Sequence, residues 1–275
     1  MTELTVRQAI QADRDAFVLT WLARLQLATA EQISALGWPG VSRSMAMRRL
    51  RRTRQTGLLE FVATQMGASR RVVLYRLTPP GAVAAGQLLG DPQVTHGVRV
   101  AAIEGIHLEH RLRVNDMVIG LVERLGPGAA EVLLPHQRRL RWQVSGGAWH
   151  EVTSDAVLVF HEAEMALVVE YDRGLRSLEG IAGQLQRYRE AGEQPDLPSW
   201  VARSSIVYVL HPPSPARATS ILHAAAEAGL EARVTVIAAH DLAVVTADAI
   251  AKAHAAKIGR RSDATTSLVA VGQDS

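Results

Sequence analysis

Apolar residues recur every three or four positions near the start of the chain, which is the spacing of one face of a helix. This pattern predicts a helix from Asp13, which serves as its cap, to Leu25. Thr29 and Gln32 have the spacing of a capping box, so they predict a second, short helix that starts immediately afterwards. Two helices joined by a tight turn are therefore expected here.

A third helix is predicted to begin at Ser42, because serine is a preferred N-cap, and to end at Gly57, because glycine often follows the last turn. We expect Met45 and Leu50 on its inner face. Six other positions of this segment are arginines, so the outer face of the helix is expected to be strongly basic.

Two segments that are rich in β-branched and aromatic residues follow, at Leu58 to Thr64 and Arg71 to Leu77. The polar stretch between them contains Gly67 and predicts a hairpin, and a helix is predicted from Pro79 to Leu89. Three helices, a hairpin and a closing helix form the order of a winged helix-turn-helix. In such domains the third helix enters the major groove of DNA.

The pattern changes after the polar stretch that begins at Gly90, which we interpret as a linker. The remaining chain predicts a long helix at 106–125, strands at 130–135, 138–144, 151–160 and 165–171, a helix at 176–191, a strand at 205–210, a helix at 215–228 and a strand at 233–238. The fold class is therefore α/β, of the α+β type. We expect one domain over residues 1–92, a second over 98–250, and a flexible basic tail over 251–275.

Composition narrows the function classes. The chain has 275 residues, a hydrophobic content of 48% and no cysteine, so disulfides and thiolate metal sites are excluded. No apolar run reaches the ~20 residues that span a bilayer. The N-terminus lacks the basic and then apolar pattern of a secretion signal. We expect a cytoplasmic bacterial protein with no membrane partner, associated with the nucleoid or with a plasmid.

Charge is distributed unevenly along the chain. The net charge is only +3, but residues 1–95 carry twelve arginines against six acidic residues. Between Ser42 and Arg76 the chain has nine arginines and a single acid, Glu60, which is the electrostatic pattern expected of phosphate contacts. The alternative is a solvated basic helix in a structural domain. We predict double-stranded DNA as the partner, with base contacts from Ser42, Arg43, Ser44 and Met47 and phosphate contacts from Arg48, Arg51, Arg52, Arg70 and Arg71.

Carboxylates mark two neighbouring strands of the second domain. Asp155 begins one apolar strand, and the next strand ends at Glu170, with Asp172 two residues later. This order is similar to the PD-(D/E)XK restriction-endonuclease-like core. That resemblance implies that Asp155 and Glu170 converge on magnesium or manganese, for which oxygen ligands are well suited. Glu109, on the long helix, is a candidate for an additional carboxylate ligand.

Two further features bear on catalysis. Gln184 and Tyr188 resemble the Gln-x-x-x-Tyr motif of some nucleases of this fold. The lysine that ordinarily follows the glutamate by two residues is replaced here by Asp172. If the site is active, its catalytic residues are Asp155, Glu170, Asp172, Gln184 and Tyr188. The alternative is that Asp172 and Arg173 pair with neighbours at the end of a strand.

The chain as a whole resembles the replication-relaxation family of plasmid and phage-associated proteins. The resemblance extends over residues 12–240 and rests on the arginine-rich winged helix and on the segments at 110–116, 154–156, 169–174 and 184–188. One departure is Ser154, where the family more often has proline. The resemblance implies a role in replication or in DNA relaxation.

Because the lysine is missing, we favour a DNA-binding protein over an enzyme. The expected function is sequence-specific binding of duplex DNA that controls transcription or replication of a mobile element. The second domain is expected to make a homodimer or to contact DNA, and no cofactor is expected. The alternative is a DNA nuclease or nickase that depends on magnesium or manganese. A zinc site at His107 and His110, three residues apart on one helix, is a weaker possibility because no third ligand accompanies them.

Overall fold

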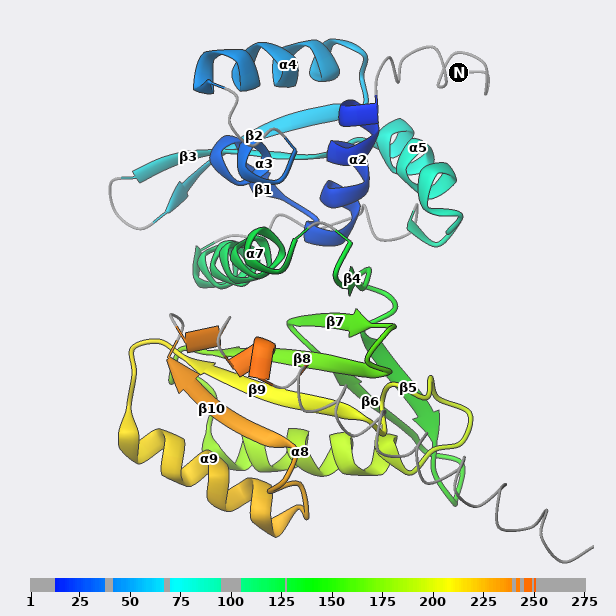
Figure 1. Cartoon of the computed structure of the whole chain (residues 1–275), viewed down its shortest axis with the longest axis vertical. Coiled ribbons are helices and arrows are strands. Elements are labelled where there is room, and N and C mark those ends of the chain that lie inside the picture. Colours follow the sequence, from blue (N-terminus) through cyan, green and yellow to red (C-terminus); the bar gives the residue numbers. More distant parts are fainter. Residues whose placement is uncertain are drawn as a thin grey trace, which may run out of the picture. The chain divides into compact units, whose positions relative to one another are not determined.

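The computed structural model describes residues 13–37, 42–66, 70–94, 105–126, 128–238 and, beyond these, 241–242, 245–248 and 250. The chain forms two compact units. The first comprises Met1–Glu123 and Val132–Arg139, and the second comprises Arg124–Glu131 and Leu140–Ser275. Helices and strands occur in both, so the expected α+β class is confirmed (Figure 1). The tail expected at 251–275 lies outside the described residues.

The first unit contains most of the helices that the sequence predicts. Its elements are α2 (Asp13–Leu25), β1 (Ala28–Thr29), α3 (Ala30–Gly37), α4 (Arg43–Gln55), β2 (Leu59–Met66), β3 (Arg70–Leu77), α5 (Pro79–Leu89) and α7 (Gly105–Leu125). The three strands form a sheet in the order β1-β3-β2, with both pairings antiparallel. The sequence pattern missed β1, because a strand of two residues is too short to show alternation.

Local signals in the sequence set the ends of these helices. The backbone N–H of Thr29 donates to Gln32 Oε1 at 3.0 Å, and the Gln32 N–H donates to Thr29 Oγ1 at 3.2 Å, which confirms the capping box. Ser42 caps α4 by accepting from the Met45 N–H at 3.4 Å. After α4 the chain turns at Gly57, where φ is +77°, a conformation that favours glycine.

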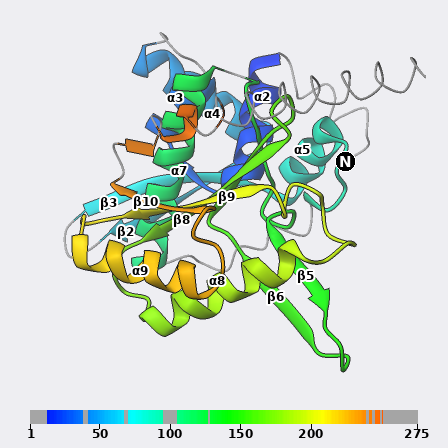
Figure 2. The ribbon, with the colours of Figure 1, turned by 60° about the horizontal axis from the view of Figure 1, so that its bottom comes forward.

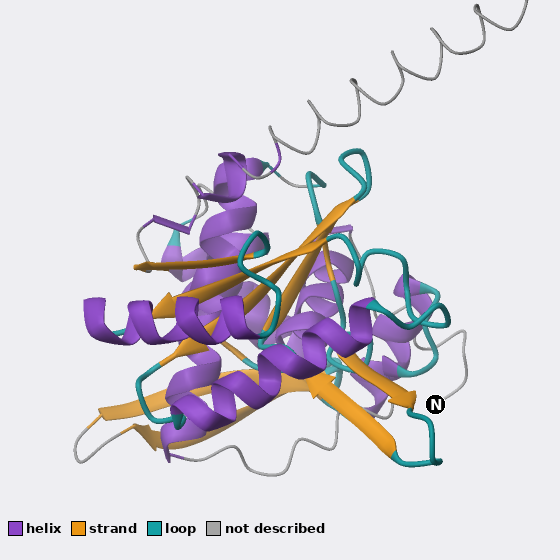
Figure 3. Cartoon of the chain, turned by 90° about the horizontal axis from the view of Figure 1, so that it is seen from below, coloured by secondary structure: helices purple, strands orange, loops and turns teal. Residues whose placement is uncertain are grey.

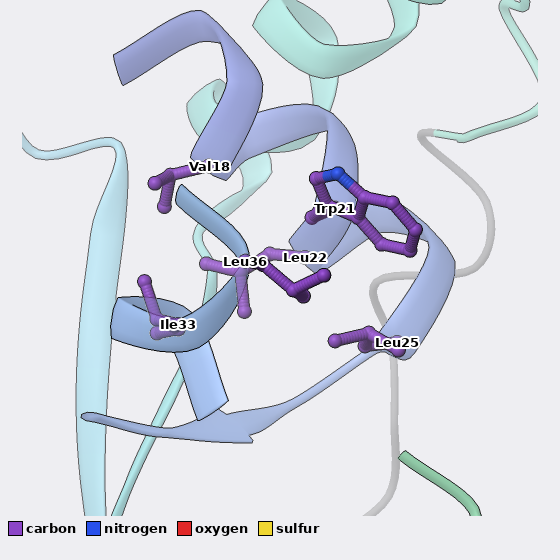
Figure 4. Close-up of a pocket in the computed structure, with 6 residues that line it drawn as sticks. All are labelled: Val18, Trp21, Leu22, Leu25, Ile33 and Leu36. Atoms are coloured by element: carbon purple, nitrogen blue, oxygen red, sulfur yellow. The ribbon is translucent and has the colours of Figure 1, made fainter. Parts of the chain in front are cut away.

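Helices α2 and α3 pack through apolar side chains that line a small pocket (Figure 4). Its lining consists of Val18, Trp21, Leu22, Leu25, Ile33 and Leu36. Five of these, from both helices, are among the buried core residues: Val18, Leu22, Leu25, Ile33 and Leu36. The three- and four-residue spacing seen in the sequence therefore marks a true interior face.

The long helix α7 packs with the first unit, although the sequence suggested that it opens the second domain. Leu108 and Leu112 join a buried cluster with Leu27 and Leu74. In addition, Asn115 is 1% exposed and its Nδ2 donates to the Leu27 carbonyl at 2.7 Å. The boundary between the two units therefore follows most of this helix instead of preceding it.

The second unit is built around a mixed sheet. Its elements are β4 (Glu131–Val132), β5 (Arg139–Gln143), β6 (Trp149–Thr153), β7 (Ala156–Phe160), β8 (Met165–Asp172), α8 (Leu178–Gly192), β9 (Ser204–Leu210), α9 (Pro215–Glu227) and β10 (Val234–Ala238). The sheet order is β10-β9-β8-β7-β4, and β5 and β6 form a separate two-stranded sheet. All residues of β7 and β8 are buried, which identifies these strands as the centre of the core.

Both α8 and α9 cover the same face of this sheet (Figure 3). Strands β8, β9 and β10 are successive parallel neighbours, connected by α8 and then by α9. Crossovers between parallel strands are almost always right-handed, so two steps in one direction place both helices on one side. Side chains of β8 and β9 that point to this side can therefore meet α8.

The strand expected at 151–160 is in fact two strands, and this corrects the sequence interpretation. Ser154 and Asp155 interrupt it, so that β6 pairs with β5 while β7 pairs with β8. The β5–β6 hairpin extends away from the main sheet (Figure 2). The polar run Thr153-Ser154-Asp155, immediately before the apolar run 156–160, was the available sequence signal for this break.

No described helix is long and apolar enough to cross a membrane.

Candidate functional site

The arginines of α4 lie on its solvent face. Ala46, Leu50 and Thr53 are buried at a spacing of three and four residues, so they form the inner stripe of the helix. The arginines Arg48, Arg51, Arg52 and Arg54 are exposed as a consequence. Among the described residues no acidic side chain forms an ion pair with any of these four arginines. The helix therefore presents an uncompensated positive surface.

One expectation for this helix is wrong. Met45 was predicted to face the core, but its side chain is 37% exposed and its sulfur accepts from Arg48 Nη2 at 2.7 Å. Ala46 occupies the interior position in its place. Ser42 is exposed, but its hydroxyl caps the helix and contacts Ser44 Oγ at 3.1 Å. Met47 is half-buried.

The hairpin contributes an aromatic residue that the sequence interpretation did not select. Phe61 is 43% exposed, and the guanidinium of Arg54 lies 4.0 Å from the centre of its ring. Glu60, the single acid of this region, pairs across the hairpin with Arg76 at 2.5 Å. Arg43 lies in α4, and Arg70 and Arg71 lie in β3, but their side chains are outside the described part of the structure.

In the second unit, strand register brings together residues that are distant in sequence. Ala156 is opposite Val169 in the antiparallel pair of β7 and β8. Asp155, one residue before β7, therefore lies beside Glu170, and its Oδ2 accepts from the Tyr171 N–H at 2.9 Å. On the other side of β8, Glu170 is paired in register with Tyr208 of β9.

Helix α8 contributes two further polar side chains next to Glu170 and Tyr208. Tyr188 and Gln184 are one turn apart and both are buried. The Tyr188 hydroxyl donates to Glu170 Oε1 at 2.5 Å and lies 2.9 Å from Ser154 Oγ. The Tyr208 hydroxyl donates to Gln184 Oε1 at 3.1 Å. A buried hydrogen-bond network thus surrounds the Glu170 carboxylate, which is 2% exposed.

Two arginines neutralise the acidic strand end. Arg217, at the start of α9, binds Asp172 through its Nε and also through its Nη2, which is 3.0 Å from Oδ1. The same Nη2 donates to the carbonyl of Arg176 at 2.6 Å. Arg176 itself donates to Gln184 Oε1, and its Nη1 is 3.8 Å from Glu170 Oε2. Neither arginine was selected from the sequence.

The charge state of Glu170 is strongly affected by its surroundings. The pKa of this carboxyl is raised to about 8, chiefly by burial and also by the nearby Asp155 charge. The hydrogen bond from Tyr188 and the Arg176 charge act in the opposite direction. Burial and the Glu170 charge also raise the pKa values of the Tyr188 and Tyr208 hydroxyls, so both phenols remain hydrogen-bond donors.

The residues present do not fit a divalent metal site well. Asp155 and Glu170 supply two carboxylates, but Asp172 is bound by Arg217. In the described part of the chain no group of three or more His, Asp or Glu side chains could hold a metal ion. Glu109 belongs to the first unit, so neither unit by itself assembles the three expected ligands Glu109, Asp155 and Glu170.

The structure therefore groups four of the candidate catalytic residues and separates one. Glu170, Gln184 and Tyr188 share one buried network, and the half-buried Asp155 lies beside Glu170. Asp172 is instead part of an ion pair at the end of β8, as the alternative interpretation expected. The residues that the sequence interpretation missed are Ser154, Arg176, Tyr208 and Arg217. A tyrosine within the otherwise aliphatic run 206–210 was the available signal for Tyr208.

Replacing Arg217 by methionine is expected to reduce the free energy of unfolding by about 3 kcal/mol, because Asp172 would remain buried without its counter-ion. Adding Asp172→Asn to this variant should recover a large part of the loss. Urea denaturation followed by circular dichroism measures both. Arg203→Met breaks an exposed pair with Glu164 and should cost less than about 1 kcal/mol. Equal effects of the two arginine variants would contradict the role of Arg217.

Glu170→Gln is expected to change how stability depends on pH. A carboxyl whose pKa is about 8 in the folded protein and lower in the unfolded chain binds its proton more tightly when folded. The contribution of Glu170 to stability is therefore greatest at low pH and falls as pH rises to 8, with a slope of up to about 1.4 kcal/mol per pH unit. The difference in unfolding free energy between the parent and Glu170→Gln should show this slope between pH 5 and 8.

The exposed Glu231→Gln substitution is the control, and its difference from the parent should stay flat across the same range. A flat difference for Glu170→Gln as well would mean that the Glu170 carboxyl titrates normally.

Comparison with known proteins identifies the family. The family model described as Replication-relaxation matches residues 19–196, which is more than half of the chain. No curated protein and no solved structure matches the chain. The matched region includes α4, the hairpin and the residues Asp155, Glu170, Gln184 and Tyr188. The chain therefore belongs to the replication-relaxation family.

Proposed function

We propose that the protein binds double-stranded DNA sequence-specifically and thereby regulates transcription or replication of a plasmid, phage or other mobile element. The observation that carries the proposal is the solvent face of α4, where four arginines have no acidic partner among the described residues. Such a surface neutralises phosphates and releases their counter-ions. Membership of the replication-relaxation family supports a role in replication.

The topology of the first unit supports a winged helix-turn-helix. The order is helix, short strand, two helices and hairpin, and the short strand β1 lies beside the second hairpin strand β3. In this arrangement α4 is the recognition helix and the β2–β3 hairpin is the wing. The exposed arginines then lie on the element that enters the major groove.

The side chains of α4 divide into two roles under this proposal. Arg48, Arg51 and Arg52 contact phosphates, because they are exposed and no acidic side chain pairs with them among the described residues. Ser44 and Met47, near the start of the helix, face base edges. Arg54 is positioned by Phe61, so it contacts the backbone beside the wing.

Arg51→Gln and Arg52→Gln are expected to weaken DNA binding similarly on all sequences. Each substitution removes one phosphate contact, so the slope of log K against log salt should fall by about 1 per arginine. Fluorescence anisotropy with a duplex, recorded across a salt series, measures the slope. Arg189→Gln removes an exposed arginine from α8 and serves as the matched control, with an unchanged slope expected. If the salt slope were the same for all variants, these α4 arginines would not contact DNA phosphates.

The second unit is proposed to join two chains into a homodimer. Each chain offers one α4, and two such helices on a palindromic site read twice as many base pairs as one. Size-exclusion chromatography with light scattering is expected to give twice the 29.8 kDa chain mass, both free and on DNA. A mass of one chain in both states would exclude the dimer.

A DNA nuclease or nickase dependent on magnesium or manganese is the second candidate. The grouping of Asp155, Glu170 and Gln184 favours it, whereas the pairing of Asp172 with Arg217 opposes it. Incubated with supercoiled plasmid and either metal, the parent is expected to leave the plasmid intact. Nicking that is lost in both Asp155→Ala and Glu170→Ala, at matched DNA binding, would establish the enzyme instead.

A further inference from the structure

The Arg176 guanidinium lies close to the buried Glu170 carboxylate and its hydrogen-bond network. Arg176 comes from the loop between β8 and α8, and its Nη1 reaches Gln184 Oε1 and lies 3.8 Å from Glu170 Oε2. Asp155, which contributes to the electrostatic environment of Glu170, lies on the neighbouring strand end. Glu170 and Gln184 therefore face a guanidinium group, and Asp155 lies on the neighbouring strand.

The main chain of Arg176 is held in place by a second arginine. Arg217 Nη2 donates to the Arg176 carbonyl at 2.6 Å and to Asp172 Oδ1 at 3.0 Å. Gly174 N–H also donates to Asp172 Oδ1, at 3.1 Å, so Asp172 and Arg217 fix the loop at two points. The backbone from which the Arg176 side chain reaches Glu170 is thereby fixed.

We infer that the Arg176 guanidinium takes the place of a divalent cation in this cluster and excludes metal ions from Asp155 and Glu170. A cation beside Glu170 lowers the cost of the ionised carboxylate in this buried position. Arginine supplies it permanently, since its guanidinium does not lose its proton in proteins. A divalent ion at the same oxygens would be repelled by this charge, and it would also have to displace the Arg176 bond to Gln184.

This inference goes beyond DNA binding by α4 and does not depend on it. It predicts that loss of the Arg176 charge opens the oxygens of Glu170 and Gln184, beside the Asp155 carboxylate, to a metal ion. Hard oxygen ligands of this kind suit Mn²⁺ and Mg²⁺. The Arg176 side chain is 43% exposed, so its replacement is expected to leave the fold intact.

The test is a titration of the full-length protein with Mn²⁺, in which electron paramagnetic resonance measures the free ion. The parent is expected to show no Glu170-dependent site, whereas Arg176→Met should bind one Mn²⁺ at least about tenfold more tightly than the parent. Arg176→Lys retains the positive charge and should behave like the parent. Adding Glu170→Gln to Arg176→Met should remove the new site.

Arg187→Met is the matched control, because it removes an exposed arginine of α8 from the same unit, and it should bind no more Mn²⁺ than the parent. Arg176→Gln provides a second charge-removing variant, and a thermal melt verifies that each variant is folded. Two results would overturn the inference. One is Mn²⁺ binding by the parent that Glu170→Gln abolishes, and the other is no gain of binding in folded Arg176→Met and Arg176→Gln. Neither result bears on DNA binding, which is measured separately.

Discussion

The second unit depends on the register of β8 between its two neighbours. Antiparallel pairing with β7 places Asp155 beside Glu170, and parallel pairing with β9 places Tyr208 on its other side. Alternate residues of a strand point to opposite faces, so a slip of one residue would turn Glu170 away from α8. Its hydrogen bond from Tyr188 would then be lost. One strand alignment thus determines which side chains can meet.

The two units use arginine in different ways. In α4 the buried stripe of Ala46, Leu50 and Thr53 leaves the arginines on the solvent side, where their charge is available to a partner. In the second unit Arg176 and Arg217 are directed at carboxylates of the same chain. A side chain that is already neutralised contributes little to the binding of an external phosphate, so the two units differ in what they can recognise.

Much of the fold could be predicted from the sequence, because its signals are local. Ser42, Gly57 and Pro79 mark helix ends through backbone hydrogen bonding and conformation, and the structure places the ends there. The proximity of Asp155 and Glu170 also followed from two adjacent strands. The break at Ser154 was missed although a polar run marks it, and only strand pairing decided that the two halves join different sheets.

The sequence by itself determined most of the elements, their order and the excess of arginine in the first unit, because caps, periodicity and composition act over a few residues. Only the tertiary structure decided that α7 packs with the first unit and that Arg217 binds Asp172, a residue 45 positions earlier in the chain. It also decided that Arg176 faces Glu170. Such pairings depend on strand order and on crossover handedness, which bring distant segments together. A local sequence pattern does not indicate which distant segments will be in contact.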